Sequence, residues 1–277
     1  MLNYGYRSGA DDPPDIGRQV QVDLNRGLDA DMVIQDYLKQ AHAILDAVAN
    51  EEAKALEKAA AVIADAYVAE HTIYVFGCTH SAILAEDVFY RAGTPTFWRP
   101  LWGPGMSIAA TPGFLTSAVE HNEDVGRAVI ECSQLGKDDV LVVISTSGKN
   151  GAPVAVAEAA LKRGATLIVL SSSAYREQKG DHHSIPNLWS LADRAIVIDN
   201  HVPRGDASIT VGKCAMGPLS TIVGSFVMHT LSALAVQKIA ERGLTPPVFL
   251  SSNAPGGREH NEKLLADPKV RDAFLLP

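Results

Sequence analysis

Val140-Leu-Val-Val-Ile144 is followed at once by Ser145-Thr-Ser-Gly-Lys-Asn150, so an apolar run ends abruptly in hydroxyl groups, a glycine and a lysine. Five apolar residues, four of them β-branched, are too few for an ordinary helix. They are typical of a strand buried on both faces of a parallel sheet. A turn at the carboxyl end of that strand then presents the hydroxyl groups of Ser145, Thr146 and Ser147, and Gly148 allows a close backbone approach or a positive φ.

The residues after this turn predict a helix, because apolar positions from Ala152 to Arg163 follow helical spacing. The free N–H groups and the dipole at a helix N-terminus favour an anion. With Lys149 and Asn150 beside them, the hydroxyl groups resemble a cradle for a phosphate or sulfonate group. The alternative is an ordinary strand-to-helix turn with an N-cap, which uses the same residue types.

A second turn repeats the arrangement: the apolar run Ile73–Phe76 leads into Gly77-Cys-Thr-His-Ser81, and a helix is predicted over about 81–92. In open α/β sheets, ligands bind outside the carboxyl ends of the strands, where the strand order reverses. Two such turns can face each other across that crevice, which makes Cys78, Thr79 and Ser81 candidate ligand contacts.

Strands and helices alternate along most of the chain, which predicts right-handed βαβ units and a mainly parallel α/β sheet. The predicted strands are 72–77, 95–99, 139–145, 166–171 and 194–199, and the helices between them are 81–92, 123–135, 152–163 and 187–192. Further helices are predicted over 31–50, 51–70, 218–242 and 259–265, and a loop over 200–217. We therefore expect an N-terminal arm over 1–30 and a single domain over 31–277.

The two turns resemble those of the sugar isomerase (SIS) domain family, which read roughly G-x-G-x-S and S-x-S-G-x-T. The resemblance covers about residues 35–265 and includes Ala85 to Gly93, Pro246 to Phe249, Asn253 and Glu259-His-Asn261. It implies a three-layer sandwich with five strands in the flavodoxin-like order 2-1-3-4-5, a helical N-terminal extension, and a homodimer or homotetramer. Cys78-Thr79 replaces the second glycine of the first motif, and Asn150 stands where many relatives have a hydroxyl group, which leaves the ligand open.

The composition narrows the classes of partner. The net charge of −8, without a run of Lys or Arg, argues against nucleic-acid binding. Three cysteines without C-x-x-C spacing indicate neither a disulfide framework nor a zinc ribbon, so we expect a cytoplasmic protein. The apolar stretch 216–236 is interrupted by polar residues and favours a buried helix over a membrane span. No cofactor is expected, because the first turn lacks the G-x-G-x-x-G of a dinucleotide site.

Interconversion of an aldose and a ketose needs a base that moves a proton between C1 and C2, and a donor that helps to open the ring. By resemblance, Glu259 is the predicted base, in its own subunit or across a dimer, His260 the predicted donor and Asn261 a ligand contact. The alternative is that Glu259 only caps the last helix and that His260 lies on the surface.

Two further residues are candidates for chemistry. His80 lies within the first turn, where it either contacts the ligand or only holds the loop. Glu86 is about one and a half helical turns beyond Ser81, and its alternative is a buried ion pair with Arg91 or Arg99.

A metal site is not expected. His182-His183, His201 and Asp206 suggest one, but adjacent histidines usually point in different directions and no H-x-x-x-H spacing is present.

The leading functional hypothesis is therefore ketose–aldose isomerisation of an anionic sugar. The alternatives are lyase or etherase chemistry on a sugar phosphate and a non-catalytic phosphosugar sensor. A DNA-binding regulator is disfavoured, because the residues before the first strand carry no plausible recognition helix.

Overall fold

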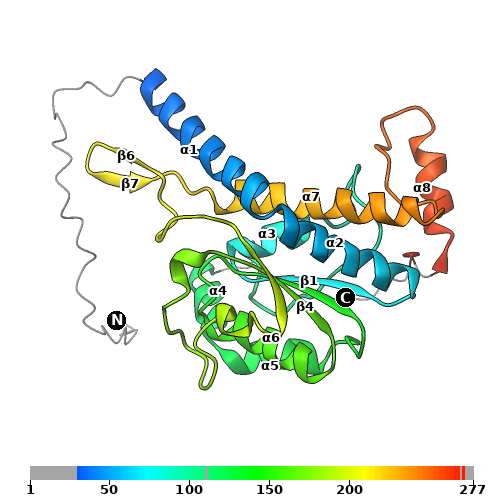
Figure 1. Ribbon diagram of the computed structural model, residues 1–277, viewed down its shortest axis with the longest axis horizontal. Helices are drawn as coiled ribbons and strands as arrows, with labels where there is room; N and C mark the ends of the chain where they lie inside the picture. Colours follow the sequence, from blue (N-terminus) through cyan, green and yellow to red (C-terminus); the bar gives the residue numbers. More distant parts are fainter. Residues whose placement is uncertain (1–29, 110–111, 269, 272–277) are drawn as a thin grey trace.

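One five-stranded parallel sheet organises the protein, whose computed structural model describes residues 30–109, 112–268 and 270–271 (Figure 1). The strand order is β2-β1-β3-β4-β5, as predicted. The strands are β1 Ile73–Gly77, β2 Trp98–Pro100, β3 Val140–Ile144, β4 Thr166–Ser171 and β5 Ala195–Asp199. All residues of β1 and β3 are buried, which agrees with their continuous apolar sequences.

Helices cover both faces of the sheet and complete a three-layer sandwich. The α-helices are α1 Ala30–Glu51, α2 Ala53–Val68, α3 His80–Asp87, α4 Gly113–Glu120, α5 Glu123–Glu131, α6 Gly151–Lys162, α7 Ser220–Glu241 and α8 Gly257–Leu265, and the 3-10 helices are η1 Ser173–Tyr175 and η2 Leu188–Leu191. Helices α2, α3 and α7 pack on one face, whereas α5, α6 and η2 pack on the other.

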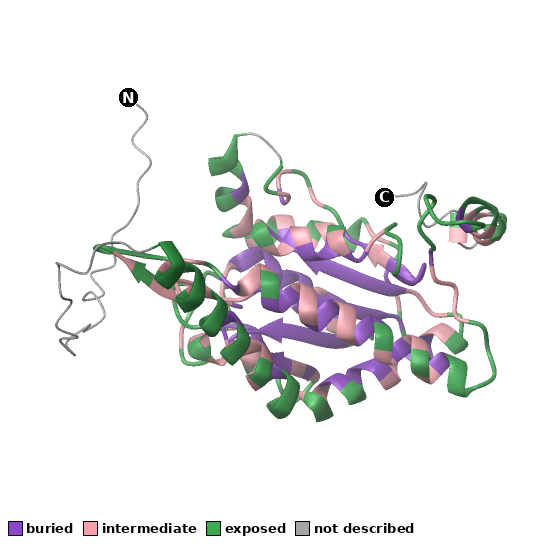
Figure 2. Cartoon of the chain, turned by 90° about the horizontal axis from the view of Figure 1, so that it is seen from above, coloured by how far each residue is buried: buried purple, intermediate pink, exposed green. Residues whose placement is uncertain are grey.

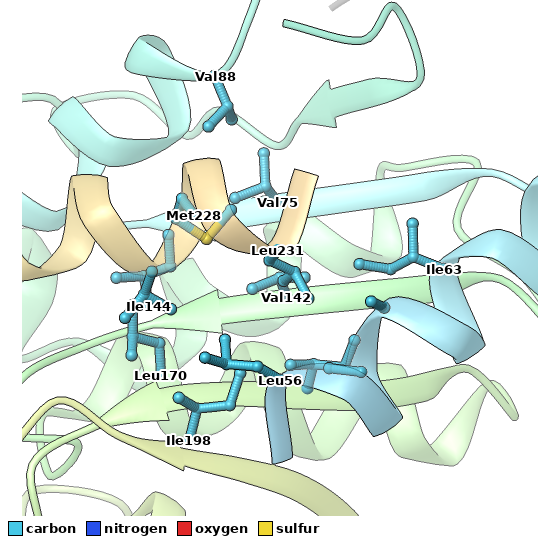
Figure 3. Close-up of a cluster of buried hydrophobic side chains, with 14 of the residues drawn as sticks. Leu56, Ile63, Val75, Val88, Val142, Ile144, Leu170, Ile198, Met228 and Leu231 are labelled. Atoms are coloured by element: carbon cyan, nitrogen blue, oxygen red, sulfur yellow. The ribbon is translucent and has the colours of Figure 1, made fainter. Parts of the chain in front are cut away.

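The hydrophobic core divides into two clusters because successive side chains of a strand point to opposite faces. In β3, Val142 and Ile144 belong to the cluster with α2 and α7, and Leu141 and Val143 to the cluster with α5 and α6. Figure 3 shows the first cluster closing around Val142. Buried residues accordingly concentrate in the strands and on the helix faces turned toward them (Figure 2).

The structure differs from the sequence predictions in several places, among them β2, which begins at Trp98, and α5, which ends at Glu131. A helix not predicted from the sequence, α4, precedes α5, and a hairpin of β6 Ile209–Val211 and β7 Cys214–Met216 lies within the predicted loop 200–217. Helix α3 ends at Asp87, earlier than predicted, and Gly93 N donates to Phe249 O in the segment that follows. The predicted arm over residues 1–30 lies outside the described residues apart from Ala30, the first residue of α1.

Within the described part of the chain, α7 is the one helix whose length and composition would allow it to cross a membrane. Of its most apolar window, 44% is buried. Val223, Val227 and Leu231 belong to the first cluster, beside residues of α2 and β3. This packing is that of a core helix.

A buried hydrogen bond ties this helix to the edge strand β2. Trp98 Nε1 donates to Ser232 Oγ at 2.9 Å, and both side chains are buried. We predict that Ser232→Ala lowers the free energy of unfolding by about 1–3 kcal/mol, because it leaves the indole N–H without an acceptor. Urea unfolding measures the change. Ser117→Ala, on the exposed side of α4, is the control and should change stability by less than about 0.5 kcal/mol; equal effects of the two would contradict the prediction.

Candidate functional site

The two predicted turns begin side by side at the carboxyl edge of the sheet. Strands β1 and β3 are neighbours in parallel register, and Gly77 pairs with Ile144 at their ends. Loop one, which we define as Cys78–Ser81, and loop two, Ser145–Asn150, therefore start next to each other. The strand order reverses here, between β1 and β3, which is where the sequence predicted a ligand-binding crevice, and that crevice stays a prediction.

Loop one has a constrained backbone. Thr79 has φ of +56°, a region in which non-glycine residues are uncommon. Its N–H donates to Met106 O at 2.7 Å, and it forms an isolated bridge with Ser107. Cys78 is 1% exposed, and burial raises the pKa of its thiol to about 12. The thiol therefore lies in the core as a neutral group. A ligand contact from Cys78 stays a prediction, and it would be made by the main chain of this residue.

Loop two is shaped by its own hydroxyl groups. Gly148 N donates to Ser145 Oγ at 3.2 Å, and Asn200 Nδ2 donates to Thr146 Oγ1, also at 3.2 Å. Gly148 has φ of +61°, and a Cβ atom there would lie 2.5 Å from Ser171 Oγ, so glycine is required. The side chain of Ser147, by contrast, is half-buried and makes no hydrogen bond within the described residues.

Asn150 occupies the N-cap position of α6 without capping the helix through its side chain. Instead, its side chain lies near Glu120, the last residue of α4, and lowers the pKa of that carboxyl group. The N-terminus of α6 thus keeps main-chain N–H groups that no side chain caps, at the end of a loop that carries hydroxyl groups. This arrangement favours a bound anion more than the sequence alone did.

Glu120 joins the two loops and is the main site residue that the sequence analysis missed. The side chains of Asn150 in loop two and Thr79 in loop one lie near its carboxyl group and lower its pKa. Burial raises the pKa of this carboxyl group, whereas these two side chains and the charge of His121 oppose the rise. A partly buried carboxylate between two hydroxyl-bearing loops has the environment of a catalytic acid or base.

His121 and Asp181 form a pair beside Glu120. His121 Nδ1 lies 2.5 Å from Asp181 Oδ2, and Asp181 N donates to Lys149 O in loop two at 3.1 Å. A signal for this region was present in the sequence, because Glu-His-Asn occurs both at 120–122 and at 259–261. The sequence analysis considered only the second occurrence, and the structure places the first at the crevice.

The second triplet lies elsewhere within the protomer. Helix α8 lies at the end of the molecule opposite α4 (Figure 1). His260 Nε2 is 2.9 Å from Val248 O, and Asn261 Nδ2 donates to Leu250 O at 2.8 Å. These two side chains hold α8 against the preceding segment, and Glu259 is exposed. A role for any of the three in the crevice of the same protomer is not supported by this geometry.

The remaining candidates are dispersed around the crevice. His80 is exposed at the start of α3, and Lys149 is half-buried in loop two. Glu86 Oε1 accepts a hydrogen bond from Ser107 Oγ at 2.9 Å. The alternative for Glu86 was a buried ion pair with Arg91 or Arg99. Arg91 instead forms an ion pair with Asp87, the residue that follows Glu86.

His182 and His183 lie with Glu123, not with His201 and Asp206. Glu123 Oε2 is 2.9 Å from His183 Nδ1 and 3.6 Å from His182 Nε2. However, His182 Nδ1 accepts hydrogen bonds from Ser184 N and Ile185 N. A neutral ring in that position carries its proton on Nε2, so this nitrogen does not offer a lone pair to a metal ion.

Asp206 and His201 lie apart from His182 and His183, and each has partners of its own. Asp206 Oδ1 accepts hydrogen bonds from Leu219 N and Ser220 N and so holds the start of α7. His201 Nε2 lies 3.3 Å from Glu52 Oε1, at the junction of α1 and α2.

Comparisons with known proteins agree with the motifs. Residues 36–172 match the model of the SIS domain. The chain is 33% identical to a UPF0309 protein of Shouchella clausii over 87% of this chain and 99% of the relative. It is 35% identical to a UPF0309 protein of Geobacillus thermodenitrificans over 88% of this chain and 98% of the relative.

The fold is also that of a solved structure, the phosphoheptose isomerase from Neisseria gonorrhoeae. The two share 14% sequence identity and a TM-score of 0.52, over 76% of this chain and all of the isomerase. At this identity the likeness concerns the fold. The chain therefore belongs to the family of UPF0309 proteins and carries a SIS domain, as its two loops predicted.

Proposed function

We propose that this protein binds a phosphorylated or similarly anionic sugar in the crevice between loop one and loop two, and that it interconverts the ketose and the aldose through an enediol. The observation that carries the proposal is the position of Glu120, whose carboxyl group lies near the side chains of Thr79 in loop one and Asn150 in loop two. A proton-transferring group and an anion cradle are thereby combined in one place.

The anion is assigned to loop two and the N-terminus of α6. With a net charge of −8, the overall field of the protein repels an anion, so the attraction must be local. Ser147 offers a hydroxyl group, Lys149 an ammonium group, and the first turn of α6 main-chain N–H groups. The likeness to a phosphoheptose isomerase supports the same assignment at the level of fold.

The base is assigned to Glu120. In the isomerisation, a carboxylate takes the proton from C2 of the aldose while O1 gains a proton, and the enediol forms. The carboxyl group then delivers a proton to C1 while O2 loses its proton, and exchange of the carboxyl proton with solvent before this step places deuterium on the sugar in D₂O. A base works best when its pKa lies near the working pH. Burial raises the pKa of Glu120 in that direction.

A contribution from Glu259 and His260 would require a second copy of the chain. Both residues lie on α8, at the end of the molecule opposite α4. We therefore propose Glu120 as the base within one protomer, and we place Glu259 as a group that a homodimer or homotetramer could bring to a neighbouring crevice. A pair of variants separates the two assignments.

We predict that Glu120→Gln lowers the rate of C2 proton exchange roughly 10²- to 10⁴-fold, the usual contribution of a general base. Glutamine keeps the hydrogen-bonding shape of the side chain, so the affinity for the sugar should change little. The measurement is deuterium incorporation followed by NMR in D₂O, with a panel of sugar phosphates and their sulfonate analogues. Because the pKa of Glu120 is raised, the wild-type rate should fall on acidification at a higher pH than for an exposed glutamate.

Glu259→Gln is the matched comparison and should retain exchange. Loss of exchange in Glu259→Gln with an active Glu120→Gln would transfer the base to α8 of a neighbouring subunit. Binding without exchange in the wild-type protein would show a sensor, and release of an ether substituent would show a lyase. Either result would overturn the isomerase assignment.

We also predict that Ser147→Ala weakens binding of the sugar phosphate roughly 10- to 100-fold, because one hydrogen bond to a charged group is worth about 1.5–3 kcal/mol. Binding of the same sugar without its phosphate should be unchanged. Titration calorimetry measures both affinities, with Ser117→Ala as the control. An equal loss for the two sugars would place the phosphate outside loop two.

A further inference from the structure

The geometry points to His121, oriented by Asp181, as the group that donates a proton to the ring oxygen of the sugar and so opens the ring before isomerisation. This inference rests on the proposed function and assigns a second catalytic residue to the same crevice. It begins from the contact between His121 Nδ1 and Asp181 Oδ2, which are 2.5 Å apart although the residues are 60 positions apart in the sequence.

Both members of the pair are fixed to loop two and α6. Asp181 N donates to Lys149 O at 3.1 Å. At Gly180, the preceding residue, a Cβ atom would lie only 1.5 Å from the same carbonyl oxygen, so the two main chains are packed directly on each other. On the other side, His121 O lies 2.5 Å from where a Cβ of Gly151 would be. The pair therefore sits over the start of α6, where we place the anion.

The pair also acts electrostatically on Glu120. The charge of His121 lowers the pKa of the Glu120 carboxyl group, and the charge of Asp181 raises it. His121 directly follows Glu120 in the chain, at the end of α4. A proton donor and a proton acceptor thus stand side by side between the loops.

Accessibility distinguishes this histidine from His182, which also lies close to carboxylates. The side chain of His121 is 52% exposed and that of Asp181 is 42% exposed, whereas the side chain of His182 is fully buried. A substrate in the crevice can reach His121. Most of the ring of His121 is also open to solvent, which can return a proton to it after each turnover.

The contact with Asp181 determines which nitrogen of the His121 imidazole ring exchanges protons with a substrate. A carboxylate at Nδ1 holds the proton of that nitrogen and leaves Nε2 as the atom that exchanges protons with a substrate. In the ring-opening step, the anomeric hydroxyl group loses its proton to water and the carbonyl group forms. The bond between the anomeric carbon and the ring oxygen breaks, its electron pair stays on the oxygen, and His121 Nε2–H supplies the proton to that oxygen.

The test compares the ring-forming substrate identified by the exchange panel with its deoxy analogue that lacks the ring-closing hydroxyl group and stays open-chain. We expect His121→Gln to lower turnover of the ring-forming substrate roughly 10²-fold or more. Proton exchange with the open-chain analogue should stay within a few-fold of wild type, because that substrate has no ring to open. Glutamine can still form a hydrogen bond with Asp181, and a thermal unfolding scan controls for folding.

An equal loss on both substrates would show a general disturbance of the site, and no loss on either would remove His121 from the reaction. Both results overturn the inference. If the wild-type protein exchanges neither substrate, the isomerase assignment itself fails, and this inference fails with it.

Asp181 is a positioning residue and needs a different readout. We expect Asp181→Asn to lower kcat for the ring-forming substrate while KM and exchange with the open-chain analogue are kept, and Asp181→Glu to restore part of kcat. Asp193→Asn, at an exposed pair with Arg194, is the matched control. A rise in KM on both substrates would indicate that Asp181 only holds loop two.

Discussion

The parallel pairing of β1 with β3 is the constraint on which the rest of the site depends. Because Gly77 and Ile144 are partners at the ends of these strands, loop one and loop two have to emerge next to each other. The apolar residues of both strands are buried on two faces, so neither strand can shift by one residue without exchanging its core side chains between the two clusters. The strand register therefore fixes the position of the two loops relative to each other, and few contacts within the loops are needed to fix it.

Glu120 adds what the sheet cannot supply, a charged group held between the two loops. It belongs to α4, outside the βαβ units that build the sheet, and lies near the side chains of Thr79 and Asn150, of which Asn150 gives no side-chain cap to α6. The strained backbone of Thr79, with φ of +56°, belongs to the same arrangement, since strain of this kind is concentrated at functional sites.

Much of the fold followed from the sequence because its signals are local. Val140–Ile144 and Ile73–Gly77 are apolar throughout and end in glycine or hydroxyl residues, so the strands, their parallel pairing and both loops were predictable. Helix α4 was not, because it is a short helix of 8 residues of which Thr116 is the one that is buried, although Phe114, Leu115, Ala118 and Val119 follow helical spacing. Asp181 was missed for a different reason: its partner His121 is 60 positions away in the sequence, and no local pattern reports such a contact. Glu120 had a local signal in the triplet Glu-His-Asn at 120–122, but the same triplet at 259–261 was preferred.

The covering of the sheet by α7 has a consequence for any shortened form of this protein. The segment that matches the SIS domain model ends at residue 172, before β5 and α7. A fragment cut at that boundary would present β4 as an open edge and would uncover Val142, Ile144 and Leu170, which lie in one cluster with Leu231 of α7 (Figure 3). An uncovered apolar face beside an unpaired strand is a template for self-association. The smallest self-contained form of this fold therefore has to include the long helix α7, although that helix lies outside the segment that matches the domain model.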